Sequence, residues 1–322
     1  MLVSIVTPSF NQAEYLEATI QSVLAQDYSD LEYIIVDGAS TDGSVEIIKK
    51  YADQLSWWVS EPDQGQADGI NKGLRRARGD VVAWLNSDDI YFPGAIQAAV
   101  AAFQTELDSG MVFGDAITID HAGHPLNRLS FGDWGLPELM RFRIICQPAV
   151  FMRRAALEQV GYLDENFHFM LDHHLWMRIA SCFGIKHSPQ VWAAARHHPS
   201  AKNVAQSEAF AEETYRAVEW LKAAPDFYVQ FQADRHRILG GANRLAGRYL
   251  LAGGLPGPAL IAYGKAMFYW PSYAIKHWGR IAFAFMNLLG LGDLEAWGRR
   301  QVPQLDASGL ENWPGINLER GP

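Results

Sequence analysis

The chain has 322 residues, with 27 basic and 36 acidic side chains and a formal net charge of −9. Hydrophobic residues make up 49% of it and charged residues 20%, a balance that excludes a disordered or fibrous protein. The acidic charge argues against nucleic acid as a partner bound through the overall field. Two cysteines, Cys146 and Cys182, exclude a disulfide framework or a zinc ribbon and predict a reducing, cytoplasmic compartment.

Apolar runs that predict buried strands alternate with helical spacings of apolar residues through the first part of the chain. The predicted strands cover residues 3–8, 33–37, 56–60 and 81–85. The predicted helices cover residues 13–26, with Asn11 as a cap, then 45–51 and 66–78. Strands alternating with helices of this length predict an α/β fold with a mostly parallel, doubly wound sheet.

Polar side chains gather where the predicted strands end. The first strand ends in Thr7-Pro8-Ser9 and the second in Asp37, residues 61–65 follow the third, and residues 86–89 follow the fourth. Ligands of such sheets bind beyond the carboxyl ends of the strands, so a site is expected at this edge. Each of these loops taken alone is better explained by the preference of Asp, Asn and Ser for turns and caps, whereas four consecutive strand ends together favour a site.

A nucleotide bound at this edge would need a cation to neutralise its phosphates, because the sequence has neither a P-loop nor a dinucleotide-type glycine loop. Asp88 and Asp89 directly follow the apolar strand 81–85, and adjacent carboxylates repel each other unless a cation or water separates them. Mg²⁺ or Mn²⁺ takes one or two carboxylates together with substrate phosphates. The other interpretation of this pair is the start of the apolar helix that follows residue 94.

Seven segments with motif-like composition are spread over residues 2–200. They are V-S-I-V-T-P-S-F-N at 3–11, V-D-G-A-S-T-D-G-S at 36–44, D-G-I-N-K-G at 68–73, W-L-N-S-D-D at 84–89, Q-P-A-V-F-M-R-R at 147–154, G-Y-L-D-E at 161–165 and D-H-H-L-W-M-R at 172–178. In order and spacing these segments resemble the motifs of the family 2 inverting glycosyltransferases, in the subgroup with a D-G-x-S-T-D second motif. The resemblance implies a GT-A fold, a nucleotide-diphospho-sugar donor and Mg²⁺ or Mn²⁺.

The resemblance also implies roles for individual residues. The positions that would contact the nucleotide sugar are Thr7, Pro8, Asp37, Asp68, Lys72, Asn86 and Ser87. Asp88 would bind the metal, and His198 would reach the metal or the diphosphate, although a surface histidine fits His198 equally well. Asp172 would be the general base that takes the proton from the acceptor hydroxyl, and its place before a helical segment also suits an N-cap.

Three further residues are candidates for the acceptor side: Asp115, Asp89 and His173. Asp115 is expected to end the apolar strand 111–113, either near the acceptor or simply in a hairpin turn. His173 could touch the acceptor or tune the base, or could be exposed without a role. Three positions depart from the family pattern. Asn86 replaces the first carboxylate of the D-x-D motif, Gly38 stands where many members have a second Asp, and Leu171 precedes the presumed base where an acid is common.

The charge changes along the chain and predicts a boundary near residue 205. Positions 1–205 carry 15 basic and 25 acidic residues, whereas positions 206–322 carry 12 and 11. A GT-A catalytic domain over 1–205 would thus precede a mainly helical region over 206–322, beginning with an amphipathic helix at 206–226. Basic and aromatic residues over 227–292 suit contact with an anionic membrane surface, or else a helical unit with its aromatics packed inside on the catalytic core.

The function predicted from these features is inverting transfer of a sugar, from a nucleotide-diphospho-sugar such as a UDP-sugar, to a hydroxyl of a glycan or lipid-linked acceptor. The reaction would serve cell-surface polysaccharide synthesis, in the cytoplasm or on the inner face of the membrane. One alternative is a non-catalytic nucleotide- or sugar-binding module, which Asn86 favours. The other is a metal-dependent nucleotidyltransferase, which should carry a glycine- and cation-rich loop where this chain has residues 9–12.

Overall fold

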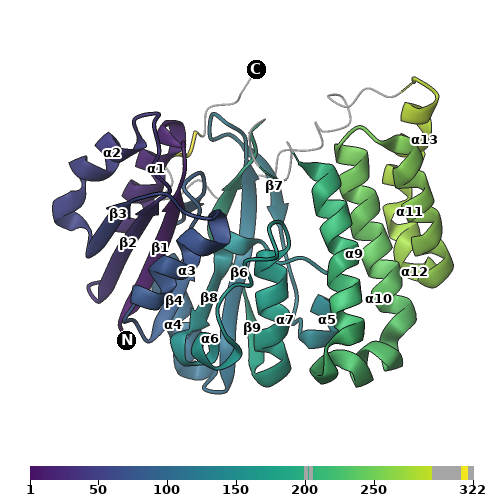
Figure 1. Ribbon diagram of the computed structural model, residues 1–322, viewed down its shortest axis with the longest axis horizontal. Coiled ribbons are helices and arrows are strands. Elements are labelled where there is room, and N and C mark those ends of the chain that lie inside the picture. The colour runs from purple at the N-terminus through teal and green to yellow at the C-terminus, as the bar shows by residue number, and fades with distance from the viewer. Residues whose placement is uncertain (199–201, 203–205, 292–312, 318–322) are drawn as a thin grey trace.

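The computed structural model describes residues 1–198, 202, 206–291 and 313–317 (Figure 1). Its first elements are β1 (Val3–Ser9), α1 (Ala13–Leu24), β2 (Leu31–Asp37), α2 (Ser44–Lys50), β3 (Trp57–Ser60), α3 (Gln66–Arg76) and β4 (Val81–Trp84). They confirm the predicted strands and helices of this stretch. The expected cap is wrong, because the N-cap residue of α1 is Gln12 and the Asn11 side chain instead accepts a hydrogen bond from the Thr41 amide at 2.9 Å.

The middle of the chain completes the sheet. Its elements are β5 (Ile90–Tyr91), α4 (Ala95–Thr105), β6 (Ser109–Ile119), β7 (Pro125–Leu129), α5 (Leu136–Met140), β8 (Val150–Arg153), α6 (Arg154–Val160), α7 (Leu171–Cys182) and β9 (Gly184–Arg196). Within the described residues, nine strands form one sheet in the order β3-β2-β1-β4-β8-β6-β9-β5, with β7 beside β6. The pairs among β1 to β4 are parallel as predicted, whereas β8 runs antiparallel to both β4 and β6.

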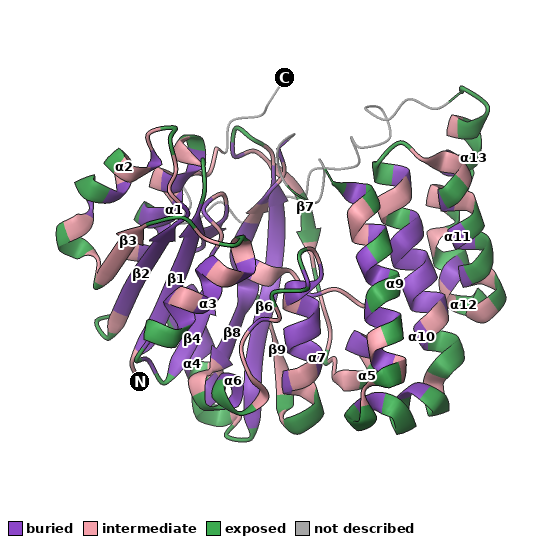
Figure 2. Ribbon diagram, in the orientation of Figure 1, coloured by how far each residue is buried: buried purple, intermediate pink, exposed green. Residues whose placement is uncertain are grey.

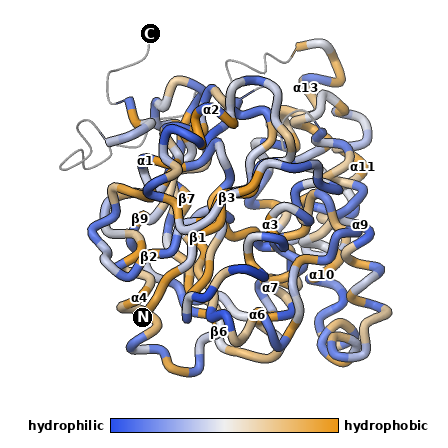
Figure 3. The backbone as a smooth tube through the Cα atoms, turned by 60° about the vertical axis from the view of Figure 1, so that its left-hand side comes forward, coloured by the Kyte–Doolittle hydropathy of each residue, from blue (hydrophilic) through white to orange (hydrophobic). Residues whose placement is uncertain are grey.

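Both faces of the sheet are covered, which explains the continuous apolar strands. All seven residues of β1 are buried, and alternate side chains enter different cores: Val3 and Ile5 pack under α1 and α4, while Val6 packs under α3. In Figure 3 the hydrophobic strand β1 lies in the interior of the molecule. Because both faces of β1 are covered, the polar side chains that follow such strands can meet a ligand where the strands end.

Strand β6 corrects one expectation. Asp115 does not end a strand, because β6 continues without a break from Ser109 to Ile119 and all eleven residues are buried. The residues after Asp115 pair with both β7 and β9, so the chain has ladder partners on each side and no reason to turn. Asp115 is thus a buried polar residue in mid-strand.

Helices make up the described chain from residue 207 to residue 288. They are α9 (Ser207–Ala223), α10 (Pro225–Ala252), α11 (Pro256–Tyr269), α12 (Pro271–Ala274) and α13 (Trp278–Leu288). Figure 1 shows α9 and α10 next to the part of the molecule that contains the sheet. The helices α11 and α13 lie beyond them, at the outer edge of the molecule. Leu221, Phe231 and Leu245 share one core with Trp176, so α9 and α10 pack directly on the sheet-bearing part.

The aromatic residues of this helical region divide between the two predicted environments. Phe231, Tyr263 and Phe283 are buried, whereas Phe268 and Trp278 are exposed (Figure 2). Within the described part of the chain, no helix combines the length and the apolar character needed to cross a bilayer.

A close approach between α10 and the backbone at Arg141 yields a first prediction. A Cβ atom on Gly241 would lie 1.9 Å from the carbonyl oxygen of Arg141, a backbone atom that cannot swing away. We expect Gly241→Ala to lower the free energy of unfolding by about 1–3 kcal/mol, because the helix must separate from that loop. Urea unfolding measures the loss.

The matched control is Gly264→Ala in α11, where a Cβ would meet nothing within 4 Å. Alanine should stabilise that helix by up to about 1 kcal/mol through its higher helix propensity. Equal unfolding free energies for the two variants would contradict the close packing of α10.

Candidate functional site

The Asp37 carboxylate orders the loop at the end of β2. Asp37 is fully buried, and its oxygens accept hydrogen bonds from the Ser40 amide at 2.9 Å, the Ser40 hydroxyl at 2.5 Å and the Ser60 hydroxyl at 2.7 Å. In β1, Thr7 turns its hydroxyl into the core, 3.0 Å from the Tyr33 hydroxyl, and Pro8 is buried beside it. Thr7, Pro8 and Asp37, which were predicted to contact the nucleotide sugar, are thus buried at the carboxyl ends of β1 and β2. Asp37 orders the loop that follows β2.

Asp63, a residue that the motifs did not single out, lies in front of β2. Its Oδ2 atom would stand 2.8 Å from a Cβ on Gly38 and 3.1 Å from a Cβ on Gly69. Gly38 therefore leaves room for a carboxylate that arrives from the loop after β3. The position where many family members carry a second Asp is thus filled in space by Asp63, and the signal was the polar run 61–65.

The first turns of α3 are held by their own polar side chains. Asp68 accepts a hydrogen bond from the Gln64 amide at 3.0 Å, and Lys72 pairs with Glu61 at 2.6 Å. Both Asp68 and Lys72 are half-buried. The lysine therefore brings a positive charge to the same edge of the sheet, where its present partner is an exposed carboxylate that a phosphate could replace.

Asn86 connects the start of α3 to the segment that precedes β8. Its oxygen accepts a bond from Gln66 at 3.0 Å, and its nitrogen donates to Gln147 at 3.0 Å and to Asp89 at 3.3 Å. A carboxylate at this position could accept but not donate, and it would face the Asp89 carboxylate. The departure from D-x-D is therefore matched to its surroundings. The neighbouring Ser87 is buried, and its carbonyl accepts the Thr19 hydroxyl at 2.9 Å.

Pairing between β5 and β9 brings Asp88 to His198. The strands are antiparallel with Ile90 opposite Ala194, so the chain before β5 runs beside the chain after β9. The Asp88 Oδ2 atom lies 3.0 Å from the Nε2 atom of His198. Two predicted metal ligands that are 110 positions apart in the sequence are thus in contact.

Asp89 has a structural position beneath this pair. Its Oδ1 atom accepts the Arg196 amide at 2.9 Å, while the Arg196 guanidinium donates to the Asp88 carbonyl at 3.0 Å. Burial, and then the charge of Asp88, raise the pKa of Asp89 well above its ordinary value. This geometry places Asp89 inside the fold rather than on the acceptor side.

The residues at this edge fit a divalent cation that shares its ligands with a substrate. Among the described residues, no group of three or more His, Cys, Asp and Glu side chains is gathered as a self-sufficient metal site. Asp88 and His198 offer one carboxylate oxygen and one imidazole nitrogen, and Mn²⁺ or Mg²⁺ commonly takes its other ligands from phosphates and water.

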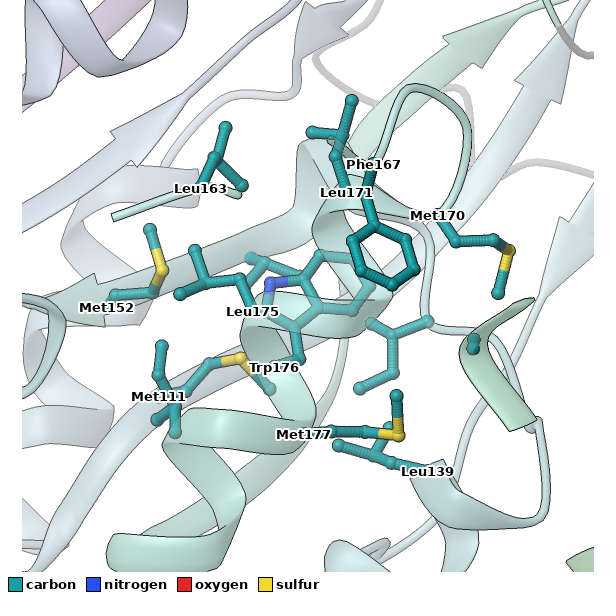
Figure 4. Packing of buried hydrophobic residues seen from close by; sticks show 14 of the residues in the cluster. Met111, Leu139, Met152, Leu163, Phe167, Met170, Leu171, Leu175, Trp176 and Met177 are labelled. Atoms are coloured by element: carbon teal, nitrogen blue, oxygen red, sulfur yellow. The ribbon is translucent and has the colours of Figure 1, made fainter. Parts of the chain in front are cut away.

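Asp172 lies in the first turn of α7 and is not its N-cap, which is Met170. Its Oδ1 atom accepts the His173 amide at 2.6 Å. Burial raises the pKa of Asp172 to about 7, and the negative charge of Glu213 adds to this effect. A carboxyl group with a pKa near neutrality is suited to take a proton from a hydroxyl. Figure 4 shows Leu171, Leu175 and Trp176 fixing α7 in the core.

His173 points into the protein rather than toward an acceptor. It is 1% exposed, its Nε2 atom lies 2.9 Å from the Leu139 carbonyl oxygen, and burial lowers its pKa to about 4. His174 is also buried and stacks on Phe167, with ring centroids 4.2 Å apart. The alternative that His173 is exposed without a role is therefore wrong, because α7 buries its ring together with that of His174.

Glu213 of α9 holds the loop that leads to Asp172, and the motifs did not point to it. Its carboxylate accepts three consecutive amides, those of His168 at 2.9 Å, Phe169 at 2.5 Å and Met170 at 2.6 Å. Glu213 is 6% exposed. A charged residue on the apolar face of an amphipathic helix was the signal that could have revealed it.

Asp115 is held in place by the strands around it. It accepts hydrogen bonds from His187 at 2.8 Å, the Phe131 amide at 3.1 Å and Arg128 at 3.2 Å. Burial alone would raise its pKa, but these bonds together lower it below the ordinary value. The ionised carboxylate therefore anchors β7 and the chain that leads to Trp134.

The segment at Cys146 adjoins the end of β4. The next residue, Gln147, accepts a hydrogen bond from Asn86 at 3.0 Å and donates one to the Trp84 carbonyl at 2.8 Å. Burial, followed by the charges of Asp89 and Asp172, raises the pKa of the Cys146 thiol.

Solved structures with the same architecture define the class of this protein. Residues 1–349 of S. aureus TarS in complex with UDP-GlcNAc match with a TM-score of 0.57 at 17% identity, covering 87% of this chain and 92% of that chain. The mannosyltransferase PcManGT from Pyrobaculum calidifontis, in complex with GDP-Man and Mn²⁺, matches with a TM-score of 0.57 at 21% identity, covering 90% and 86%. The chain has the GT-A glycosyltransferase fold.

Sequence comparison gives the family. Residues 4–161 match the model described as glycosyl transferase family 2. A Mycobacterium tuberculosis protein named PGL/p-HBAD biosynthesis glycosyltransferase is 32% identical over 184 residues, which are 56% of this chain and 69% of that protein. An uncharacterized glycosyltransferase of Nostoc is 35% identical over 51% of this chain. The chain belongs to glycosyltransferase family 2. It spans about half the length of the Nostoc relative and 34% of one from Rickettsia conorii.

The Glu213 clamp yields a second prediction. Replacing Glu213 by Gln puts an NH₂ group against amides that are themselves donors, so we expect a loss of about 1–3 kcal/mol in the free energy of unfolding. Removing the charge should also lower the pKa of Asp172, because Glu213 raises it.

Glu212→Gln, on the exposed side of the same helix, is the matched control. Chemical denaturation and a pH titration of Asp172 by NMR measure the two effects. If the two variants had the same free energy of unfolding and the same Asp172 pKa, Glu213 would not be the residue that positions the loop before Asp172.

The raised pKa of Asp172 gives a third prediction, about stability. The folded-state pKa of about 7 exceeds the ordinary value of 3.8, so this carboxyl group favours folding below pH 3.8 and loses that contribution as the pH rises through 7. Asn cannot ionise. We expect Asp172→Asn to be more stable than the wild type at pH 8 by about 1–3 kcal/mol, with little difference at pH 4.

Denaturant unfolding at the two pH values measures this difference. The exposed Asp226→Asn substitution is the control and should show no such trend. A stability difference for Asp172→Asn that does not vary with pH would contradict the buried carboxyl group.

Proposed function

We propose that this chain transfers a sugar, with inversion, from a nucleotide-diphospho-sugar to a hydroxyl of a glycan or lipid-linked acceptor, in cell-surface polysaccharide or glycolipid synthesis. The observation that carries the proposal is the 3.0 Å contact between Asp88 and His198, the two predicted metal ligands, and the pKa of Asp172, which burial raises to about 7, supports it. Similar proteins support it. The two structural neighbours were solved with UDP-GlcNAc and with GDP-Man and Mn²⁺, and the Mycobacterium tuberculosis relative is named for PGL/p-HBAD biosynthesis.

The donor, for which we propose a UDP-sugar, would lie across the carboxyl ends of β1 to β4. The loop that Asp37 orders would receive the nucleoside, and Asp63 offers it a half-buried carboxylate for a ring N–H or a ribose hydroxyl. Lys72 would exchange Glu61 for a phosphate oxygen, with Asp68 at the start of the same helix. Asn86 would bind the ribose or a water molecule.

Asp88 and His198 would hold Mn²⁺ or Mg²⁺ against the diphosphate. When bound, the cation supplies positive charge that stabilises the leaving nucleoside diphosphate. The contribution of this chain is to keep the two ligands in contact through the β5–β9 pairing and the Arg196 hydrogen bonds.

Asp172 would act on the acceptor. As the acceptor oxygen forms its bond to the anomeric carbon, the bond from that carbon to the diphosphate oxygen breaks, and the hydroxyl proton passes to the Asp172 carboxylate. An in-line displacement of this kind inverts the anomeric centre. The carboxylate must be ionised, so the rate should rise with pH through about 7.

Titration calorimetry tests the donor half, with UDP, GDP and dTDP each added in Mn²⁺ and in EDTA. We expect one nucleotide to bind in Mn²⁺ and its affinity to fall at least about tenfold in Asp88→Asn, because a charged ligand is lost. Asp53→Asn, exposed in the loop after α2, is the control. Absence of binding for all three nucleotides would refute a nucleotide-sugar donor.

Turnover tests the acceptor half, with release of the nucleoside diphosphate from the matching donor as the readout. Asp172→Asn should keep the binding of that nucleotide and lose about 10²–10⁴-fold in rate, the range for removal of a general base. The anomeric configuration of the product, read by NMR, reports inversion. Unchanged turnover in Asp172→Asn would exclude Asp172 as the base, and donor binding with no turnover would favour the binding module.

A further inference from the structure

Exposed apolar side chains form a regular stripe along α13. Trp278 is 67% exposed, Phe285 55% and Leu289 57%, and Ala282 and Met286 are exposed as well. The spacing from 278 through 282, 285 and 286 to 289 places all five on one face of the helix. The opposite face packs through Phe283 against α11, so among the described residues the stripe is the side of α13 that faces away from its packing partner.

The neighbouring segments extend this apolar exposure. Ile261 and Phe268 of α11 are 64% and 77% exposed, and Ile275, which precedes α13, is 55% exposed. Both helices lie at the outer edge of the molecule, away from the sheet (Figures 1 and 2). Figure 3 shows the same hydrophobic character at α13. We call these residues and the α13 stripe the outer apolar surface.

The charge around this surface is positive, although the chain as a whole is acidic. Residues 256–291 contain Lys265, Lys276 and Arg280 and neither Asp nor Glu. Both lysines are exposed. Burial, and then nearby Arg and Lys charges led by that of Arg244, lower the pKa of His277 to about 4, consistent with a positive field at the start of α13.

We propose that the outer apolar surface docks on an anionic lipid bilayer, with α13 lying in the interfacial plane. An interfacial helix needs an apolar face to enter the acyl boundary and basic side chains to meet the headgroups, and α11 to α13 supply both. A second copy of this chain would instead place Lys265 and Lys276 near like charges, which disfavours self-association through this face.

Docking there would bring to the membrane the helical unit that positions Asp172, and this consequence rests on the proposed function. Glu213 of α9 holds the loop that leads to Asp172, α9 packs against α10, and α10 packs against α11. The same helical unit thus joins the outer apolar surface to the site. A lipid-linked acceptor would be the substrate class that profits from this arrangement.

Vesicle sedimentation of the full chain, without donor, tests the docking itself. We expect binding to vesicles of phosphatidylcholine with phosphatidylglycerol, weaker binding to phosphatidylcholine alone, and a partition coefficient at least about tenfold lower for the double variant Phe285→Glu with Met286→Glu. Leu107→Glu is the matched control, because Leu107 is 76% exposed near the end of α4 and should not affect binding.

The charge contribution is tested separately by Lys276→Glu against Lys49→Glu, which make the same change on exposed lysines of different segments. Only Lys276→Glu should weaken binding to the anionic vesicles, and the difference should shrink at high salt. Light scattering reports self-association of each variant. Substituted residues are exposed, and circular dichroism checks that each variant folds.

Failure of the wild type to bind anionic vesicles, or equal binding by the Phe285 and Met286 double variant, would overturn the proposal. A dimer that the double variant abolishes, without vesicle binding, would overturn it in favour of a second copy. Vesicle binding together with failed nucleotide binding would leave the docking surface standing and refute the proposed transfer, so the two failures are distinguishable.

Discussion

Backbone amides donated to buried carboxylates fix both halves of the site. Asp89 accepts the Arg196 amide and so ties the end of β4 to the end of β9, while Glu213 accepts three amides in the loop before α7. A buried carboxylate costs free energy unless such donors surround it, so each carboxylate and its loop require each other. The positions of His198 and Asp172 follow from these two clamps, since each lies two residues beyond a clamped amide.

Local patterns were enough to predict β1, β2 and β4, because burial of both faces leaves a continuous apolar run that ends in polar loops. They failed where distant segments decide the structure. Asp115 resembled a strand end until β7 and β9 supplied ladder partners on both sides. The contact of His198 with Asp88 depends on a register between segments about 100 positions apart, which no local spacing encodes. Glu213 was missed because helix periodicity describes apolar positions and does not say which loop a buried charge will meet.

Two of the departures from the family pattern, Gly38 and Asn86, have one physical explanation: each position is matched to a neighbouring carboxyl group. Gly38 lacks a side chain where the Asp63 carboxylate lies, and Asn86 donates toward Asp89 where a carboxylate would repel it. At Gly38, the loop after β3 thus supplies the carboxylate that the motif position lacks. Counting acidic residues at motif positions alone therefore misses Asp63.

The boundary near residue 205 stays a prediction, and the contacts across it show how the second part could serve the first. Glu213 keeps a negative charge close to Asp172 and helps to raise its pKa, and Gly241 lets α10 lie against the 141–146 segment. Because the pKa of Asp172 is about 7 in the folded chain and 3.8 ordinarily, its ionised form is less stable in the folded chain than in water. The free energy that makes Asp172 reactive must then come from the packing of α9 and α10 around it. A change in composition along the chain therefore need not separate two independent units.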